Sequence, residues 1–158
     1  VKAPRVVLVD SREQRPLPLA HVIRETGLHF EVQRAALATG DYCLADAPHL
    51  CLIERKSLPD LAHVVGARRE RFERELARLK AECTLPVLLV EGHVADVLRH
   101  DYPGTVHPNA VVGSVASWAI DFGLRVFWCG TPLEAAHVAL RIFGTVARRV
   151  ERGELAAG

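Results

Sequence analysis

Apolar segments of two kinds alternate along the chain. The runs 5–9, 28–36, 50–54, 85–91 and 124–129 are short and largely apolar, as strands are, and the first of them is rich in β-branched residues. Helical spacing or capping signals predict helices over 17–26, 57–64, 67–82, 94–98, 108–121 and 132–152. Helices that alternate with strands predict an α/β fold, in which a central sheet is covered by helices on both faces.

Several segments carry a more specific signal. Residues 40–42 have the composition of a turn, and polar neighbours on both sides of the strand 50–54 indicate a sheet edge or a hairpin. The helix 67–82 has one apolar stripe, which predicts a buried face: Phe72, Leu76, Leu79 and Cys83. The last helix has a similar stripe, which fits either the core or a dimer face: Ala135, Val138, Ile142, Val146 and Val150.

Length and composition limit the class of protein. The 158 residues, 49% hydrophobic and 25% charged, predict one folded domain over 1–158. Every apolar run is shorter than a membrane span, so we expect no membrane partner. The four cysteines have no CxxC spacing, which favours buried thiols and an intracellular location, in the cytoplasm, the nucleoid or the nucleus depending on the source. The net charge of +1 points to no class of partner.

Charged residues gather at the ends of the predicted strands. In chain order they are Asp10, Arg12, Glu13, Asp41, Glu54, Arg55 and Lys56. Side chains at i and i+2 share one face of a strand, so Glu54 and Lys56 should project together and Arg55 away from them. If the sheet brings these carboxylates together, their repulsion calls for a cation, and Mg²⁺ prefers carboxylate oxygens.

Lysine is rare in this chain, which makes Lys56 stand out. Only three of the 20 Lys and Arg residues are lysines. A lysine beside a metal site can have a shifted pKa and act on a water molecule. Simpler interpretations remain open for single residues: Glu54 and Lys56 as an exposed ion pair, and Asp41 and Asp60 as ordinary turn residues.

Three segments, in order, resemble the signatures of one enzyme family. Residues 9–13 (VDSRE), 40–42 (GDY) and 54–60 (ERKSLPD) resemble the VDxRE, GDY and ERKxxxD motifs of the XPF-type structure-specific endonucleases. This resemblance implies a restriction-endonuclease-like core with a central mixed sheet. It also implies a metal-dependent endonuclease that hydrolyses phosphodiester bonds in branched, flap or junction DNA during repair or recombination.

The resemblance also assigns roles to residues. It implies catalytic roles for Asp10, Glu13, Asp41, Glu54, Arg55, Lys56 and Asp60. Asp41 and Glu54 match metal-binding carboxylates, and Lys56 matches the catalytic lysine. Asp10 and Glu13 match acidic positions at the same site. We therefore expect Mg²⁺, or Mn²⁺ in its place, and contacts with DNA phosphates from four arginines: Arg12, Arg55, Arg68 and Arg69.

Other interpretations remain open. The helix that follows residue 68 has Glu and Arg at i, i+4 spacing, so Arg68 and Arg69 could belong to a solvated, salt-bridged face. A catalytically silent DNA-binding or scaffold module that partners an active nuclease is one alternative function. A metal-dependent phosphohydrolase that acts on RNA or nucleotides is another. The resemblance makes a homodimer or a heterodimer plausible.

Overall fold

The computed structural model describes residues 5–156. Its elements alternate between strands and helices along most of the chain, as predicted. In order they are β1 (Arg5–Asp10), α1 (Leu19–Thr26), β2 (Phe30–Ala35), β3 (Tyr42–Leu44), β4 (Cys51–Ser57), α2 (Leu58–Gly66), α3 (Arg69–Glu82), β5 (Leu85–Glu91), α4 (Val94–Leu98), α5 (Pro108–Phe122), β6 (Arg125–Cys129) and α6 (Pro132–Glu151).

The strands form one mixed six-stranded sheet in the order β2-β1-β3-β4-β5-β6. Strand β3 pairs antiparallel with both β1 and β4. The other three pairs, β1 with β2, β4 with β5 and β5 with β6, are parallel. The hairpin expected around residues 50–54 is confirmed, but a sheet edge there is wrong because β4 lies inside the sheet. Residues 40–42 are not only a turn, since Tyr42 begins the three-residue strand β3.

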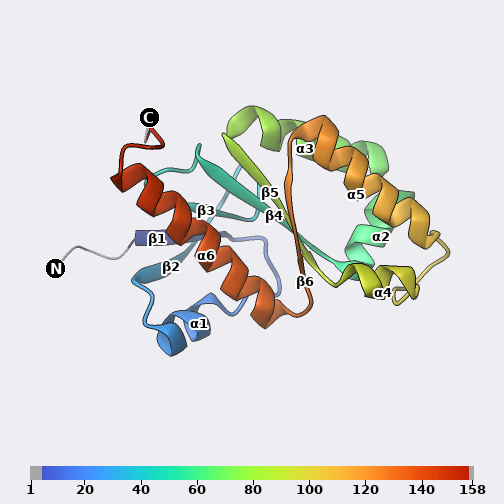
Figure 1. Ribbon diagram of the computed structural model, residues 1–158, viewed down its shortest axis with the longest axis horizontal. Helices are drawn as coiled ribbons and strands as arrows, with labels where there is room; N and C mark the ends of the chain where they lie inside the picture. The colour runs from blue at the N-terminus through green and yellow to red at the C-terminus, as the bar shows by residue number, and fades with distance from the viewer. Residues whose placement is uncertain (1–4, 157–158) are drawn as a thin grey trace.

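Helices cover both faces of the sheet, which confirms the predicted layers (Figure 1). One hydrophobic core lies between the sheet and the helices α1 and α6, and it includes Val7, Ile53 and Leu140. The other lies beneath α2, α3, α4 and α5, and it includes Leu88 and Trp118. Alternation along each strand therefore decides which helical layer a side chain meets.

The predicted apolar stripe of α3 is buried in the second core. Phe72, Leu76 and Leu79 are each at most 1% exposed. The Phe72 ring meets Trp118 edge to face, with ring centroids 5.0 Å apart, and this tryptophan is itself buried in the core. The cysteines are free and buried, and burial raises the pKa of the Cys51 thiol to about 12.

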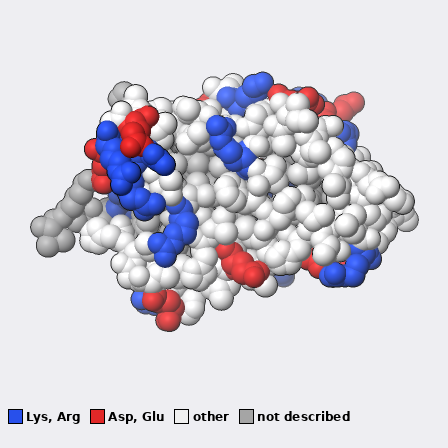
Figure 2. Space-filling view, in the orientation of Figure 1, with Lys and Arg blue, Asp and Glu red and all other residues white. Residues whose placement is uncertain are grey.

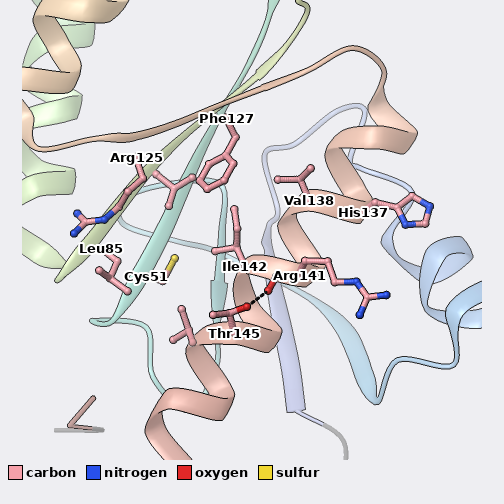
Figure 3. A pocket seen from close by; sticks show the side chains of 11 residues that line it. Cys51, Leu85, Arg125, Phe127, His137, Val138, Arg141, Ile142 and Thr145 are labelled. Atoms are coloured by element: carbon pink, nitrogen blue, oxygen red, sulfur yellow. Dashed lines mark hydrogen bonds between the residues drawn. The ribbon is translucent and has the colours of Figure 1, made fainter. Parts of the chain in front are cut away.

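The sheet face beneath α6 also has an apolar pocket of about 510 Å³ (Figure 3). Phe127, Val138 and Ile142 line it, while Arg125 and Arg141 extend outward on either side. Charged residues on this side of the molecule lie mostly toward its margins (Figure 2). None of the residues proposed above as catalytic lines this pocket. Within residues 5–156, no helix is both long and apolar enough to span a membrane.

The first turn of α6 supplies a test of the fold that does not touch the strand ends. Thr131 Oγ1 accepts a hydrogen bond from the Glu134 amide (3.1 Å), and a Glu134 carboxylate oxygen accepts one from the Thr131 amide (2.6 Å). We expect Thr131→Ala to lower the free energy of unfolding by about 1 kcal/mol, because the Glu134 amide in the first turn loses its side-chain acceptor. Urea denaturation followed by circular dichroism measures the loss.

The control for this variant is Thr145→Ala in the same helix. The Thr145 hydroxyl donates to the Arg141 carbonyl (2.8 Å) and accepts from Arg148 Nη2 (3.1 Å). Both bonds are exposed and neither caps the helix, so removing the hydroxyl should change the free energy by less than about 0.5 kcal/mol. Equal losses in the two variants would show that the capping box does not stabilise α6.

Candidate active site

The sheet topology brings the charged residues at the ends of β1 and β4 close to Asp41, at the start of β3. Because β3 is antiparallel to β1 and β4, the residues that start β3 lie beside the carboxyl ends of both neighbours. The Asp10 amide donates to the Asp41 carbonyl (2.9 Å), and the Asp41 amide donates to the Ile53 carbonyl (2.8 Å). These bonds fix the backbones of three segments that lie far apart in the sequence.

Alternation along β4 then separates two groups of side chains. Asp10, Asp41, Glu54 and Lys56 line a cavity of about 260 Å³ on the α3 side of the sheet. Arg12 also lines this cavity. The rest of its wall comes from the loop before β3 and from α3: Ala38, Thr39, Gly40, Glu75 and Arg78. On the opposite face, Glu13, Arg55, Asp60 and Glu91 line a different pocket. Arg12 borders both.

Glu54 and Lys56 face each other in the first cavity, as the i, i+2 spacing predicts. Lys56 Nζ lies 2.9 Å from Glu54 Oε1 and 5.0 Å above the centre of the Phe72 ring. Glu54 is 9% exposed, and burial raises the pKa of its carboxyl group. The simpler interpretation as an exposed ion pair is therefore wrong, because both partners lie largely out of solvent.

Asp41 is held by a backbone contact from the neighbouring strand. Its Oδ2 accepts a hydrogen bond from the Arg55 amide (2.8 Å). Burial, followed by the nearby Glu54 carboxylate, raises the pKa of Asp41 to about 8, and the Arg55 amide partly offsets this rise. Two carboxyl groups thus share a desolvated space in which both can ionise only at a high electrostatic cost.

Asp10 also faces this cavity but is already paired. Its Oδ2 accepts from Arg12 Nε (2.9 Å) and its Oδ1 from the Leu37 amide (3.2 Å). Arg12 Nη2 in turn donates to the Leu37 carbonyl (2.6 Å). The pair anchors the 35–40 loop, which forms part of the cavity wall, to the end of β1.

The opposite face holds a buried polar network centred on Arg55. Arg55 Nη1 lies 3.0 Å from Glu13 Oε2, and the guanidinium also bonds to the Glu91 carboxylate and the Arg15 carbonyl. The Tyr42 hydroxyl donates to Glu13 (3.0 Å), and burial raises the pKa of this hydroxyl. Glu13 therefore does not line the cavity that holds Asp41 and Glu54.

Three other residues singled out in the sequence lie away from this cavity. Asp60 is exposed in the first turn of α2, where its amide donates to Ser57 Oγ (3.2 Å). Arg69 is held by Glu73 (3.0 Å), by Ser114 Oγ (2.7 Å) and by the face of Trp118. Arg68 is exposed just before α3. Their functional roles remain predictions.

The donor set fits a magnesium ion that keeps much of its water. Within residues 5–156, no group of three or more His, Cys, Asp or Glu side chains forms a metal cluster. Mg²⁺ is commonly bound through one or two carboxylates plus phosphate and water oxygens, and Asp41 with Glu54 provides two. Thr39 Oγ1 is buried without a hydrogen-bond partner and belongs to the same cavity wall. These are polar surroundings suited to a hydrated cation.

Sequence reasoning missed several residues of these two clusters. Glu91 ends β5 and could have been found by the strand-end signal that drew attention to Asp10. Glu75 and Arg78 lie on a helix with the charge pattern of a solvated face, and nothing in their spacing marks them. Tyr42 lies within the GDY motif, but its contact with Glu13 depends on long-range packing.

A comparison with protein families places this chain in a known class. The family model described as the ERCC4 domain matches residues 9–142. The chain therefore belongs to the ERCC4 domain family. The resemblance to the XPF-type endonucleases, drawn from three short motifs, is thereby confirmed, since the match contains all three.

Two curated relatives are similar over most of this chain. A protein of Methanocaldococcus jannaschii named as an ATP-dependent RNA helicase is 28% identical over 141 residues, which cover 89% of this chain and 16% of that protein. The 3'-flap repair endonuclease Xpf of Saccharolobus solfataricus is 28% identical over 136 residues, covering 86% of this chain and 53% of that protein. The chain thus spans about half or less of these relatives.

Solved structures agree with the fold. XPF from Aeropyrum pernix superposes with a TM-score of 0.71 at 24% identity, over 94% of this chain and 68% of that one. The same protein in complex with DNA gives 0.69 at 24% identity, over 92% of this chain and 66% of that one. The expected restriction-endonuclease-like arrangement, a mixed sheet with helices on both faces, is confirmed.

The Arg55 network suggests a stability test. The Leu17 amide donates to the Tyr42 hydroxyl (2.9 Å) and is buried. We expect Tyr42→Phe to lower the free energy of unfolding by about 1–3 kcal/mol, because a buried amide loses its acceptor and Glu13 loses a donor. Thermal or urea unfolding measures the change.

Tyr102→Phe is the matched control. The Tyr102 hydroxyl donates to the carbonyl of the half-buried Val106 (2.6 Å), so removing it leaves no buried donor unpaired. We expect the smaller loss in this variant. A Tyr42→Phe protein as stable as the wild type would contradict the view that the network stabilises this end of the sheet.

Proposed function

We propose that this domain is a metal-dependent endonuclease that hydrolyses phosphodiester bonds in DNA at single-strand/double-strand junctions. The observation that carries the proposal is the joint position of Asp41, Glu54 and Lys56 around one small polar cavity. Two carboxylates and a lysine at the end of a strand are suited to metal-assisted hydrolysis. Membership of the ERCC4 domain family supports the same assignment.

The nature of the substrate rests on the relatives. One similar protein is named as a 3'-flap repair endonuclease, and a structural neighbour is described in complex with DNA. On that basis we propose that this chain also acts on branched or flap DNA, in repair or recombination. The homodimer or heterodimer expected from the resemblance remains a prediction.

The chemistry divides between the cavity residues. Asp41 and Glu54 would hold Mg²⁺ or Mn²⁺, which when bound polarises the phosphodiester and lowers the pKa of a coordinated water. Lys56 supplies a positive charge and N–H donors to the phosphate oxygens, and Glu54 and Phe72 keep its ammonium group in place. The Arg55 amide orients Asp41 from the backbone.

The cavity predicts which single changes abolish cutting. We expect Asp41→Asn and Lys56→Gln each to lower the rate of cleavage of a labelled 3'-flap duplex at least about 100-fold. The first removes a carboxylate that would hold the cation, and the second removes the positive charge that would act on the reacting phosphate. Chelation with EDTA should abolish cleavage, and added Mg²⁺ or Mn²⁺ should restore it. Gel analysis of the products under single-turnover conditions provides the measurement.

The control is Asp46→Asn, an exposed aspartate that pairs with Arg5 at the other end of β1. It should cleave like the wild type. Circular dichroism establishes that each variant folds. Full activity in Asp41→Asn or in EDTA would refute the proposal, as would cleavage of RNA or free nucleotides in preference to the flap. A folded wild-type protein that binds the flap without cutting it would favour the silent-module alternative.

A further inference from the structure

The cavity that holds Asp41 and Glu54 is lined by three cationic side chains, and their pairing differs. Lys56 is bonded to Glu54, and Arg12 is bonded to Asp10. Arg78 projects from α3 and makes no hydrogen bond or ion pair with any residue in the range 5–156. It is therefore the one cationic group of the cavity, in the part of the chain described, whose donors are all available.

On α3, the acidic residues about one turn from Arg78 are Glu75 at i−3 and Glu82 at i+4, and Arg78 forms an ion pair with neither. Instead, Glu75 pairs with Arg71 (3.5 Å). The next basic residue along the helix, Lys80, donates to the Asp121 carbonyl (3.0 Å) and is held against α5.

We propose that Arg78 binds a backbone phosphate of the DNA strand whose scissile bond lies at Asp41 and Glu54. This inference rests on the proposed function and adds to it a binding residue that the signature motifs do not contain. A guanidinium presents paired N–H donors that match a phosphate in a bidentate geometry. Helix α3 and the ends of the β-strands form different walls of the cavity. Arg78 therefore contacts the DNA strand from the α3 wall, not from the wall formed by β4.

The four arginines expected from the sequence to contact phosphates are less available. Arg55 is buried among Glu13 and Glu91, and Arg69 is held by Glu73 and Ser114. Arg12 would have to release the Asp10 carboxylate before it could bind a phosphate fully. Arg68, although exposed, lines a separate pocket at the start of α3. We therefore place the phosphate contact nearest the reaction on Arg78.

The test compares Arg78→Gln and Arg78→Lys with Arg141→Gln. Arg141 is an exposed arginine of α6 beside the apolar pocket, so its variant makes the same change of charge on the opposite face of the sheet. Binding of a fluorescently labelled 3'-flap duplex is measured by anisotropy in EDTA between about 50 and 200 mM salt. Cleavage in Mg²⁺ gives KM and kcat, and thermal unfolding checks stability.

We expect Arg78→Gln to weaken binding about tenfold, to raise KM, and to reduce the slope of log affinity against log salt by about 1. Compared with Arg78→Gln, Arg78→Lys should recover part of the affinity and the full salt slope. Lysine keeps the positive charge but lacks the paired N–H donors of the guanidinium. Unfolding should not change, because Arg78 stabilises no neighbour. Arg141→Gln should resemble the wild type.

The outcomes separate the two proposals. If the wild type binds and cuts the flap while Arg78→Gln matches it in affinity and salt slope, the inference about Arg78 is wrong and the proposed function stands. If Arg78→Gln and Arg141→Gln weaken binding equally, the effect is a general one of net charge, and the inference is again wrong. A wild-type protein that binds no DNA overturns both.

Discussion

Strand β3 runs antiparallel to both of its neighbours, and the position of the candidate site depends on this one constraint. Its first residues must lie beside the carboxyl ends of β1 and β4, and the hydrogen bonds from the Asp10 and Asp41 amides fix them there. With β3 parallel to its neighbours, Asp41 would lie at the far end of the sheet from Glu54. A strand of three residues thus joins acidic residues that lie more than 40 positions apart in the chain, from Asp10 to Glu54.

The pleat of β4 then points adjacent side chains to opposite faces of the sheet. Glu54 and Lys56 face the cavity, whereas Arg55 between them turns to Glu13 and Glu91 on the other side of the sheet. The two sides meet in the backbone, because the Arg55 amide bonds to the Asp41 carboxylate. Leaving buried partners unpaired is costly, so the network on one face resists any shift of β4 that would separate the carboxylates on the other.

The sequence predicted the elements well because their signals are local. The helix predicted over 57–64 is present as α2, which Ser57 caps, and the predicted limits of β5 match the structure. Local signals also placed Glu54 and Lys56 on one face, since alternation needs only that β4 be a strand. The position of Glu13 could not be predicted in this way: it follows a strand end by three residues, and its contacts depend on Tyr42 and Arg55, which reach it only in the folded sheet. Strand β3 was missed because three residues carry too little periodicity.

The balance of charge in the cavity connects cation binding with phosphate binding. Four acidic residues line it, Asp10, Asp41, Glu54 and Glu75, against three basic ones, Arg12, Lys56 and Arg78, so its formal charge is −1 when all are ionised. A divalent cation would reverse the sign to +1. The burial that raises the pKa of Asp41 also strengthens each of these interactions, because a desolvated site screens charge poorly. A bound cation would thus make the cavity more favourable for an anionic strand, although the net charge of the whole chain, +1, would attract DNA only weakly.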